Sequence, residues 1–284
     1  MPKHKFRKFE RSQTPKPFRI GEIDLAILND LAQNRFLDSK HILALHPEFK
    51  ERSVRSRLQL LYHGGYVERP VSQFGSFHPA VHLIYSLAKK GAALVAEGKN
   101  QPAPAKQPKD AGVSFMSHSL MISDFKTTIE LALKSIGQPK LYSWREPGVI
   151  DGVYFEGERL PIAPDAFFTI EDKGDLLHFF LEADRSTMTL ERMLNKLRAY
   201  WNWRAEGGQK RKLDISNFRV LTVALTEERK ENLRQIAKKA NGDKTGSDMF
   251  WFGCAKSYSL ENPENILTPI WRSAKSESLR HLLE

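Results

Sequence analysis

The chain has 284 residues, of which 40% are hydrophobic, and its 44 lysines and arginines outnumber its 34 aspartates and glutamates. This length suits about two domains, and the hydrophobic share is enough to build ordinary globular cores. No apolar run approaches the ~20 residues that span a bilayer. The single cysteine, Cys254, excludes a disulfide framework and a cysteine-rich zinc site. The single cysteine fits a reducing cytoplasm, and a net charge of +10 favours nucleic acid, rather than a membrane, as the partner.

Residues 1–19 form a basic N-terminal arm, in which seven lysines and arginines stand against one acid, Glu10. Basic side chains that neutralise DNA phosphates release counterions, so an arm on DNA would make binding depend on salt. A solvated, disordered tail is the alternative. The arm residues expected at DNA are Lys3, Lys5, Arg7 and Lys8.

Residues 20–98 show the element order of a winged helix-turn-helix domain. Apolar residues recur at helical spacing over residues 22–34, Asp38 can cap a short second helix, and Ser53 can cap a third. Two strand-like runs then flank a turn-like segment at 72–80, the predicted wing, and a last helix follows. Three helices, a hairpin and a trailing helix together predict a winged helix.

The polar side of the predicted third helix carries residues suited to DNA. Arginine and glutamine side chains can reach base edges and phosphates when a helix lies in the major groove. A merely solvated helix face is the alternative. A homodimer is compatible with this domain, because winged-helix proteins often bind paired half-sites. The helix residues expected at DNA are Arg52, Arg55, Arg57 and Gln59.

Residues 99–112 are rich in Pro, Ala, Lys and Gln without apolar periodicity, which indicates a linker. Beyond it, residues 113–284 carry a long helix, a strand, and two strands at 164–170 and 176–184 that are joined by a turn. A helix, a strand, a second helix and a last strand ending at Cys254 complete the pattern. This order predicts a mixed sheet with helices packed on it, and an α+β protein overall.

One basic segment of this half, GGQKRK at residues 207–212, indicates a loop. Its three cations suit either a phosphate backbone or plain solvent.

Three carboxylates are expected to converge in the predicted hairpin. Asp165 opens the first strand, and Glu182 and Asp184 lie two apart on the second, so these two side chains share a face. Such a cluster can bind Mg²⁺ or Mn²⁺, and a bound metal can generate hydroxide and stabilise charge on a scissile phosphate. The alternative is a strand cap at Asp165 and a structural ion-pair network formed by Glu182, Asp184 and Arg185.

The order and spacing of these motifs, from about residue 20 to residue 225, resemble the replication-relaxation proteins of plasmids and mobile elements. The resemblance implies an N-terminal winged helix joined to a domain similar to PD-(D/E)xK restriction endonucleases. It also implies a role in replication, mobilisation or their regulation. The residues that carry it are Pro164, Asp165, Glu182, Asp184, Arg185, Thr189, Lys196, Tyr200 and the segment 117–125.

The resemblance carries Asp165 and Glu182 over as metal ligands, with Asp184 as a third candidate. The nuclease pattern has a catalytic lysine at the position of Asp184, and an aspartate cannot supply that positive charge. Two residues are candidate replacements. Arg185 is adjacent but should point to the opposite sheet face, whereas Lys196 lies on the following helix, where some members of the nuclease superfamily place their lysine. A solvated helix residue is the other interpretation of Lys196. The expected catalytic set is therefore Asp165, Glu182, Asp184 and Lys196.

Two functions stay open on the sequence. The first is a duplex-DNA-binding protein whose nuclease-like domain is inactive. The second is a Mg²⁺-dependent DNA endonuclease that uses Asp165 and Glu182. A third class, an adaptor in which the winged helix docks a protein, is disfavoured by the basic arm.

Overall fold

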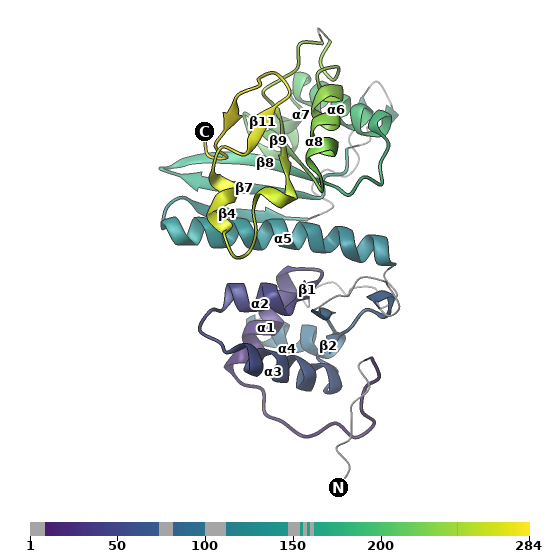
Figure 1. Cartoon of the computed structure of the whole chain (residues 1–284), viewed down its shortest axis with the longest axis vertical. Coiled ribbons are helices and arrows are strands. Elements are labelled where there is room, and N and C mark those ends of the chain that lie inside the picture. Colours follow the sequence, from purple (N-terminus) through teal and green to yellow (C-terminus); the bar gives the residue numbers. More distant parts are fainter. Residues whose placement is uncertain are drawn as a thin grey trace. The chain divides into compact units, whose positions relative to one another are not determined.

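The computed structural model describes residues 9–73, 82–99, 112–146, 154–155, 158–159, 162–242 and 244–284. The chain divides into two compact units, residues 1–127 and 128–284 (Figure 1). Helix α5 (Val113–Ile136) crosses this division, so its first part belongs to the first unit. Most of the predicted linker, residues 99–112, lies outside the described residues.

The first unit combines helices with a small antiparallel sheet in the order β1-β3-β2. Its strands are very short, and the predicted wing at 72–80 lies mostly outside the described residues. The elements are α1 (Glu22–Gln33), β1 (Leu37–Asp38), α2 (Ser39–Leu45), α3 (Glu51–His63), β2 (Val67–Glu68), a 3-10 turn η1 (Val71–Gln73), β3 (Ile84–Leu87) and α4 (Lys89–Lys99).

Local capping sets the helix starts in this unit. The Asp38 carboxylate accepts hydrogen bonds from the Lys40 and His41 main-chain N–H groups at 2.8 and 3.2 Å, which confirms the predicted cap of α2. The predicted Ser53 cap of α3 is wrong. The Ser53 N–H donates to the Lys50 carbonyl at 2.8 Å, so the helix already begins at Glu51.

The core of the first unit follows the predicted apolar stripes. Ile27 and Leu28 of α1 are buried against Val54 and Leu58 of α3, together with residues of α2, β2, β3 and α4. Because one side of α3 is covered in this way, its remaining side faces outward. This orientation decides which of its polar residues a partner can reach.

The second unit is built on a seven-stranded sheet in the order β12-β11-β10-β9-β8-β7-β4. The central strands β8, β9 and β10 are parallel and the other pairs are antiparallel, so the sheet is mixed and the chain is the predicted α+β protein. Its main elements are β4 (Lys140–Arg145), β7 (Ala166–Asp172), β8 (Asp175–Asp184), α6 (Leu190–Ala205), α7 (Gly208–Leu213), β9 (Arg219–Ala224), α8 (Glu227–Ala237), β10 (Phe250–Cys254), β11 (Trp271–Ser273) and β12 (Leu279–Arg280).

Two pairs of short elements complete the second unit. The small hairpin lies outside the large sheet, and the 3-10 turns follow β10. These elements are β5 (Tyr154–Phe155), β6 (Glu158–Arg159), η2 (Ala255–Ser257) and η3 (Pro263–Leu267).

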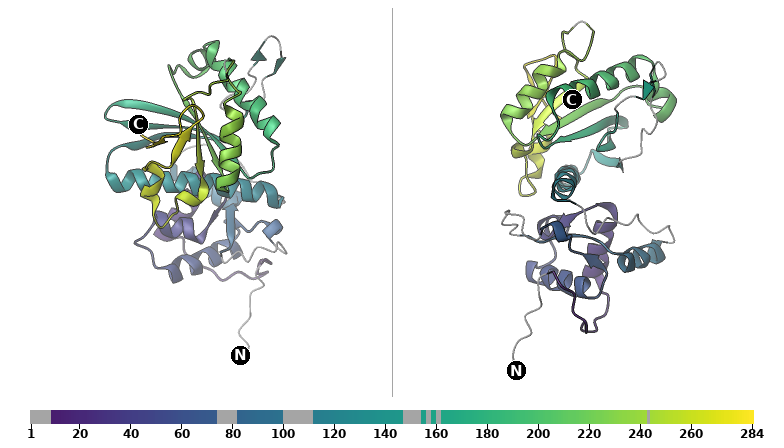
Figure 2. Two further views of the ribbon diagram at one scale, coloured as in Figure 1. Left: turned by 45° about the horizontal axis from the view of Figure 1, so that its top comes forward. Right: turned by 90° about the vertical axis from the view of Figure 1, so that its right-hand side faces the viewer.

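Helices α6 and α8 cover one face of this sheet (Figure 2). Leu197 and Tyr200 of α6 and Leu233 of α8 share one buried cluster with Phe180 of β8 and Phe250 of β10. Phe180, Glu182 and Asp184 alternate along β8, so the two acids lie on this helix-covered face. The face is apolar, and a charged group placed there needs a partner.

Of the segment 207–212, predicted as a loop, residues 208–212 belong to helix α7, so that prediction is wrong. Gly207 adopts a left-handed conformation with φ of 70°, which starts the turn. A Cβ on Gly208 would come within 2.2 Å of the Trp203 indole, so only glycine permits this close packing. Leu213, just beyond the basic run, is partly buried in the main cluster and supplies the apolar anchor.

Strands β11 and β12 extend the sheet past the strand that the sequence pattern placed last. They hold only three and two residues, too few for a clear period-two pattern. Within the described residues, no helix combines the length and the apolar character that a membrane span requires.

Candidate functional site

The outward side of α3 presents an arginine-rich surface. Arg52, Arg55, Ser56 and Gln59 are exposed there, on the side away from the buried stripe. Arg55 forms an ion pair with Glu51 one turn earlier, at 2.6 Å, and exposed pairs of this kind contribute little to stability. Both guanidiniums therefore stay accessible to an anionic partner.

Arg57, from the same predicted set, has a different environment. Its Nε donates to the Asp24 Oδ1 at 2.7 Å, and its Nη2 donates both to Asp24 and to the Arg19 carbonyl, the latter at 2.8 Å. Asp24 is fully buried at the start of α1, and this hydrogen-bonded pairing raises the pKa of Arg57. The guanidinium also lies over the Phe18 ring at 5.0 Å. Arg57 thus ties α3 to α1.

The chain just before α1 lies along α3. Arg11 donates to the Tyr62 and Val67 carbonyls at 2.9 and 3.0 Å and pairs with Glu68 at 2.8 Å. Further on, Lys16 and Gln59 line a pocket of about 160 Å³ beside α3. The structure therefore brings a lysine of the basic segment next to the exposed helix surface. The four predicted arm contacts, Lys3, Lys5, Arg7 and Lys8, lie outside the described residues.

In the second unit, Glu182 is the centre of a buried polar cluster. Lys196 of α6 donates a hydrogen bond to its Oε2, and the Tyr200 hydroxyl donates to its Oε1 at 2.7 Å. The Lys196 ammonium also donates to the Ala163 carbonyl at 2.8 Å. Glu182 is only 2% exposed, and both of its oxygens have protein partners.

Burial dominates the electrostatics of this cluster. It raises the pKa of Glu182 to about 7, with a further rise from nearby Asp165, while Lys196 and Tyr200 act in the opposite direction. The pKa of Tyr200 lies well above its ordinary value, first through burial and then through the Glu182 charge. The arrangement is a buried Lys196–Glu182 pair with the Tyr200 hydroxyl as a second hydrogen-bond donor.

Asp184, two residues further along β8, has its own cation. Arg229 of α8 binds its two carboxylate oxygens through Nε and Nη2, at 2.8 and 2.9 Å. The Ser186 main-chain N–H donates to the same carboxylate at 2.9 Å. This bidentate contact joins the end of β8 to α8.

Asp165 lies just before β7, opposite the end of β8 that carries Glu182 and Asp184. Its Oδ2 accepts a hydrogen bond from the Ala183 N–H at 2.7 Å, and its own N–H donates to the Leu181 carbonyl at 3.0 Å. The predicted strand pairing thus places Asp165 beside Glu182, as the sequence indicated. Its carboxylate holds the β7–β8 junction.

Comparison with known proteins adds one finding to this geometry. The family model described as replication-relaxation matches residues 28–216, about two thirds of the chain. The chain belongs to the replication-relaxation family. The searches of curated proteins and of solved structures found no match. As a replication-relaxation protein, the chain has a role in replication or relaxation of a plasmid or mobile element.

The part of the chain that the family match covers holds α3, Asp165, Glu182, Asp184, Lys196 and Tyr200. Arg229, the partner of Asp184, lies outside it. Sequence reasoning also missed Arg229, because this residue is 45 positions from Asp184 and only the packing of α8 on the sheet joins them. No spacing signal could have indicated that contact.

Divalent metal binding by this replication-relaxation protein needs free carboxylate oxygens. The two carboxylate oxygens of Glu182 accept hydrogen bonds from Lys196 and Tyr200, and both oxygens of Asp184 accept from Arg229. Among the described residues, no group of three or more His, Cys, Asp or Glu side chains is arranged to hold a metal ion. The residues present therefore fit the structural ion-pair interpretation better than they fit Mg²⁺.

A second buried network, which the sequence did not indicate, lies in the first unit. His41 of α2 is 2% exposed, and its ring nitrogens lie 2.9 Å from Asp38 and 2.8 Å from Asp124 of α5. Burial alone lowers the pKa of a histidine, but the two aspartates outweigh that effect and raise the pKa of His41 to about 9. His41 is thus a charged link between α2 and α5.

Proposed function

We propose that this replication-relaxation protein binds duplex DNA through its first unit, as a winged helix with α3 as recognition helix. The exposed surface formed by Arg52, Arg55 and Gln59 is the observation that carries this proposal. Arginine and glutamine are the side chains that pair best with guanine and adenine edges in the major groove. A homodimer on paired half-sites stays a prediction.

The rigidity of α3 supports this role. Its inner side is anchored by Val54, Leu58 and Leu61, all at most 1% exposed. Its flank is held by the Arg57–Asp24 pair. A helix fixed on two sides presents its outer side chains in a constant orientation, which base recognition requires.

The segment before α1 supports the same surface. Arg11 and Phe18 fix its two ends on α3, and Lys16 between them lines the pocket that Gln59 also lines. A lysine beside a recognition helix suits a contact to the phosphate backbone, which positions the helix without reading sequence. The basic arm then adds salt-dependent affinity.

For the second unit we propose a PD-(D/E)xK-like sheet that serves binding or assembly without cleaving DNA. The support is the pairing of Lys196 with Glu182 and of Arg229 with Asp184, which leaves no carboxylate pair free for a metal. The replacement of the pattern's lysine by Asp184 is in line with this role.

The test uses the full chain and a fluorescein-labelled duplex of mixed sequence, titrated at several salt concentrations. We expect the binding constant K to fall steeply as the salt concentration rises. The slope of log K against log salt concentration should become shallower by about 1 for each phosphate contact that a substitution removes. Arg52→Gln and Arg55→Gln should each weaken binding about fivefold or more. The matched control is Lys89→Gln, an exposed cation of α4 in the same unit.

The outcomes separate clearly. Loss in the α3 variants with wild-type affinity in Lys89→Gln supports the assignment of α3. If all three variants lose the same DNA affinity, the loss reflects the lower net charge of the protein and not a specific contact of α3. Absence of salt-sensitive duplex binding by the wild-type chain would overturn the proposal.

A further inference from the structure

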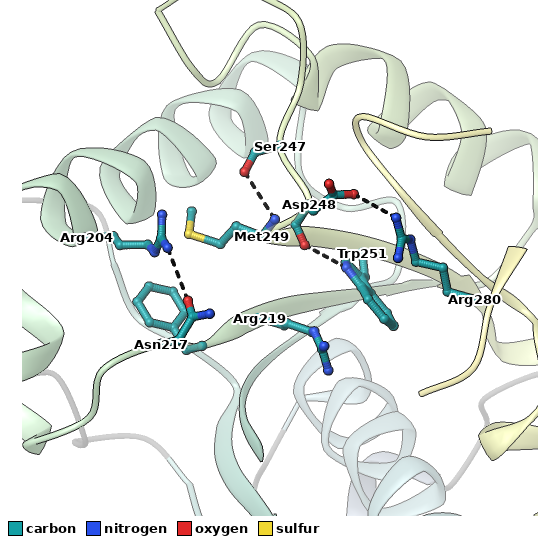
Figure 3. A pocket seen from close by; sticks show the side chains of 9 residues that line it. Arg204, Asn217, Arg219, Ser247, Asp248, Met249, Trp251 and Arg280 are labelled. Carbon is teal, nitrogen blue, oxygen red and sulfur yellow. Dashed lines mark hydrogen bonds and ion pairs between the residues drawn. The ribbon is translucent and has the colours of Figure 1, made fainter. Parts of the chain in front are cut away.

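The second unit contains a pocket of about 290 Å³ that none of the features above involves. Three arginines from three elements enter it, Arg204 of α6, Arg219 of β9 and Arg280 of β12. Figure 3 shows Arg204 and Arg280 approaching from opposite sides, with Arg219 between them. The remaining lining residues are Asn217, Phe218, Ser247, Asp248, Met249 and Trp251.

This pocket lies away from the carboxylate cluster. The lining residues Asn217 and Ser247 lie two and three residues before strands β9 and β10, at the amino ends of these parallel strands. In the register of β8 and β9, Arg219 is opposite Phe179, whereas Glu182 is opposite Thr222. The positions of Arg219 and Glu182 are therefore three residues apart along the strands, which is about 10 Å. The two features are therefore different sites.

Positive charge exceeds negative charge in the pocket. The only acid among the lining residues is Asp248, which pairs with Arg280 at 3.3 Å and accepts from the Ser273 hydroxyl at 2.7 Å. Arg204 contacts the neutral Asn217 amide at 3.2 Å. Glu284 adds a carboxylate 3.1 Å from Arg280, and Arg219 donates to the Glu284 main-chain oxygen.

The arginines are also held close to one another. Arg219 lies 4.5 Å from the centre of the Trp251 ring, and Arg280 lies 5.8 Å from the same ring. Burial and the neighbouring Arg280 charge lower the pKa of Arg219. The Arg280 Nε is buried and has no hydrogen-bond partner among the described residues. An anion in the pocket would relieve this repulsion and supply acceptors.

We propose that this pocket binds a phosphate group, carried either by the end of a DNA strand or by a free nucleotide. Guanidinium groups are planar donors that match phosphate oxygens in pairs, and three of them can surround one dianionic group. Asn217 and Ser247 offer further polar contacts, while Phe218 and Met249 form an apolar wall. A volume of about 290 Å³ suits a phosphate with part of its nucleoside. This proposal does not depend on DNA binding by α3.

The test measures the tryptophan fluorescence of the full chain, with calorimetry as a second readout, during titration with four probes. These are inorganic phosphate, deoxyadenosine monophosphate, and one short oligonucleotide with a 5′-phosphate or a 5′-hydroxyl. Arg204→Gln is the main variant, because the Arg204 side chain is partly exposed and forms a hydrogen bond with the neutral Asn217. Arg280→Gln is the second variant. Arg198→Gln, an exposed arginine on the same helix as Arg204, is the matched control.

We expect the 5′-phosphorylated oligonucleotide to bind more tightly than its hydroxyl form, and both pocket variants to lose at least tenfold in affinity. Arg198→Gln and the α3 variant Arg52→Gln should keep this preference, which separates the pocket from the proposed DNA surface. If the two pocket variants lose affinity for deoxyadenosine monophosphate to the same extent, free nucleotides are ligands of the pocket. If they do not, the pocket binds the ends of DNA strands. If no probe shows binding that Arg204→Gln and Arg280→Gln weaken, the proposal is overturned.

Discussion

Lys196 of α6 and Glu182 of β8 form a buried ion pair that joins the helix layer to the sheet. Without Lys196, the Glu182 carboxyl must either keep an uncompensated charge in an apolar layer or take up a proton, and breaking a buried pair costs about 3–5 kcal/mol. We therefore expect Lys196→Met to lower the free energy of unfolding by about 3 kcal/mol. Urea denaturation measures this, with Lys210→Met, an exposed lysine of α7, as the control.

The double variant Lys196→Met with Glu182→Leu removes both charges at once. We expect it to recover much of the stability that Lys196→Met loses, because no charge is left unpaired. If the double variant loses as much unfolding free energy as Lys196→Met and Glu182→Leu lose in sum, the two side chains do not act as a pair.

Metal-dependent cleavage is the second prediction to test. The purified chain, incubated with supercoiled or linear DNA and Mg²⁺ or Mn²⁺, should bind without cutting, because the oxygens of Glu182 and Asp184 are already bonded. Asp165→Ala and Glu182→Ala should likewise leave the DNA uncut. Cleavage that is present in the wild type and lost in both variants would instead establish an active nuclease and revise the interpretation of the cluster.

Much of this fold follows from local signals. Apolar periodicity predicted α1 and α5, and Asp38 predicted the start of α2, because these signals act within one or two helical turns. Strands β11 and β12 escaped prediction because they are short and gain their stability from an existing sheet edge. Helix α7 escaped because its formation depends on Gly208 packing against Trp203.

The candidate site was predictable in part. Alternation along β8 and pairing across the turn placed Asp165 and Glu182 together, since strand geometry determines both. The cations that neutralise the acids were less accessible to sequence reasoning. The sequence left two interpretations of Lys196 open, a residue of the site or a solvated helix residue. Arg229 is brought to Asp184 only by tertiary packing. The arginine pocket likewise joins residues of α6, β9 and β12.

The charged His41 predicts how stability depends on pH. Its pKa is about 9 in the folded chain and near 6.5 when unfolded, so folding favours the protonated form. The resulting stabilisation is complete below about pH 6.5 and is lost as the pH rises through 9. Its upper limit is about 3 kcal/mol, from the size of the shift.

Urea unfolding of the wild type and of His41→Gln at pH 6, 7.5 and 9.5 measures this dependence. The difference in unfolding free energy should be largest at pH 6 and should shrink at the highest pH. Asp124→Asn should reduce the pH dependence without abolishing it, because Asp38 still pairs with His41. A difference that stays constant over this range would show that His41 is neutral in the folded chain.

The last prediction separates two arginines of α3 that the sequence grouped together. Arg57 neutralises the fully buried Asp24, whereas Arg52 is exposed. Arg57→Gln should therefore lower the unfolding free energy by about 2–3 kcal/mol, below the full value for a buried pair because Arg57 keeps some exposure. Arg52→Gln should change stability by less than about 0.5 kcal/mol, as surface substitutions usually do. At a temperature where both variants are folded, Arg52→Gln should weaken DNA binding more than Arg57→Gln does. Equal losses of affinity in the two folded variants would mean that Arg57 leaves Asp24 to contact DNA, and then the pairing with Asp24 would be a property of the free protein.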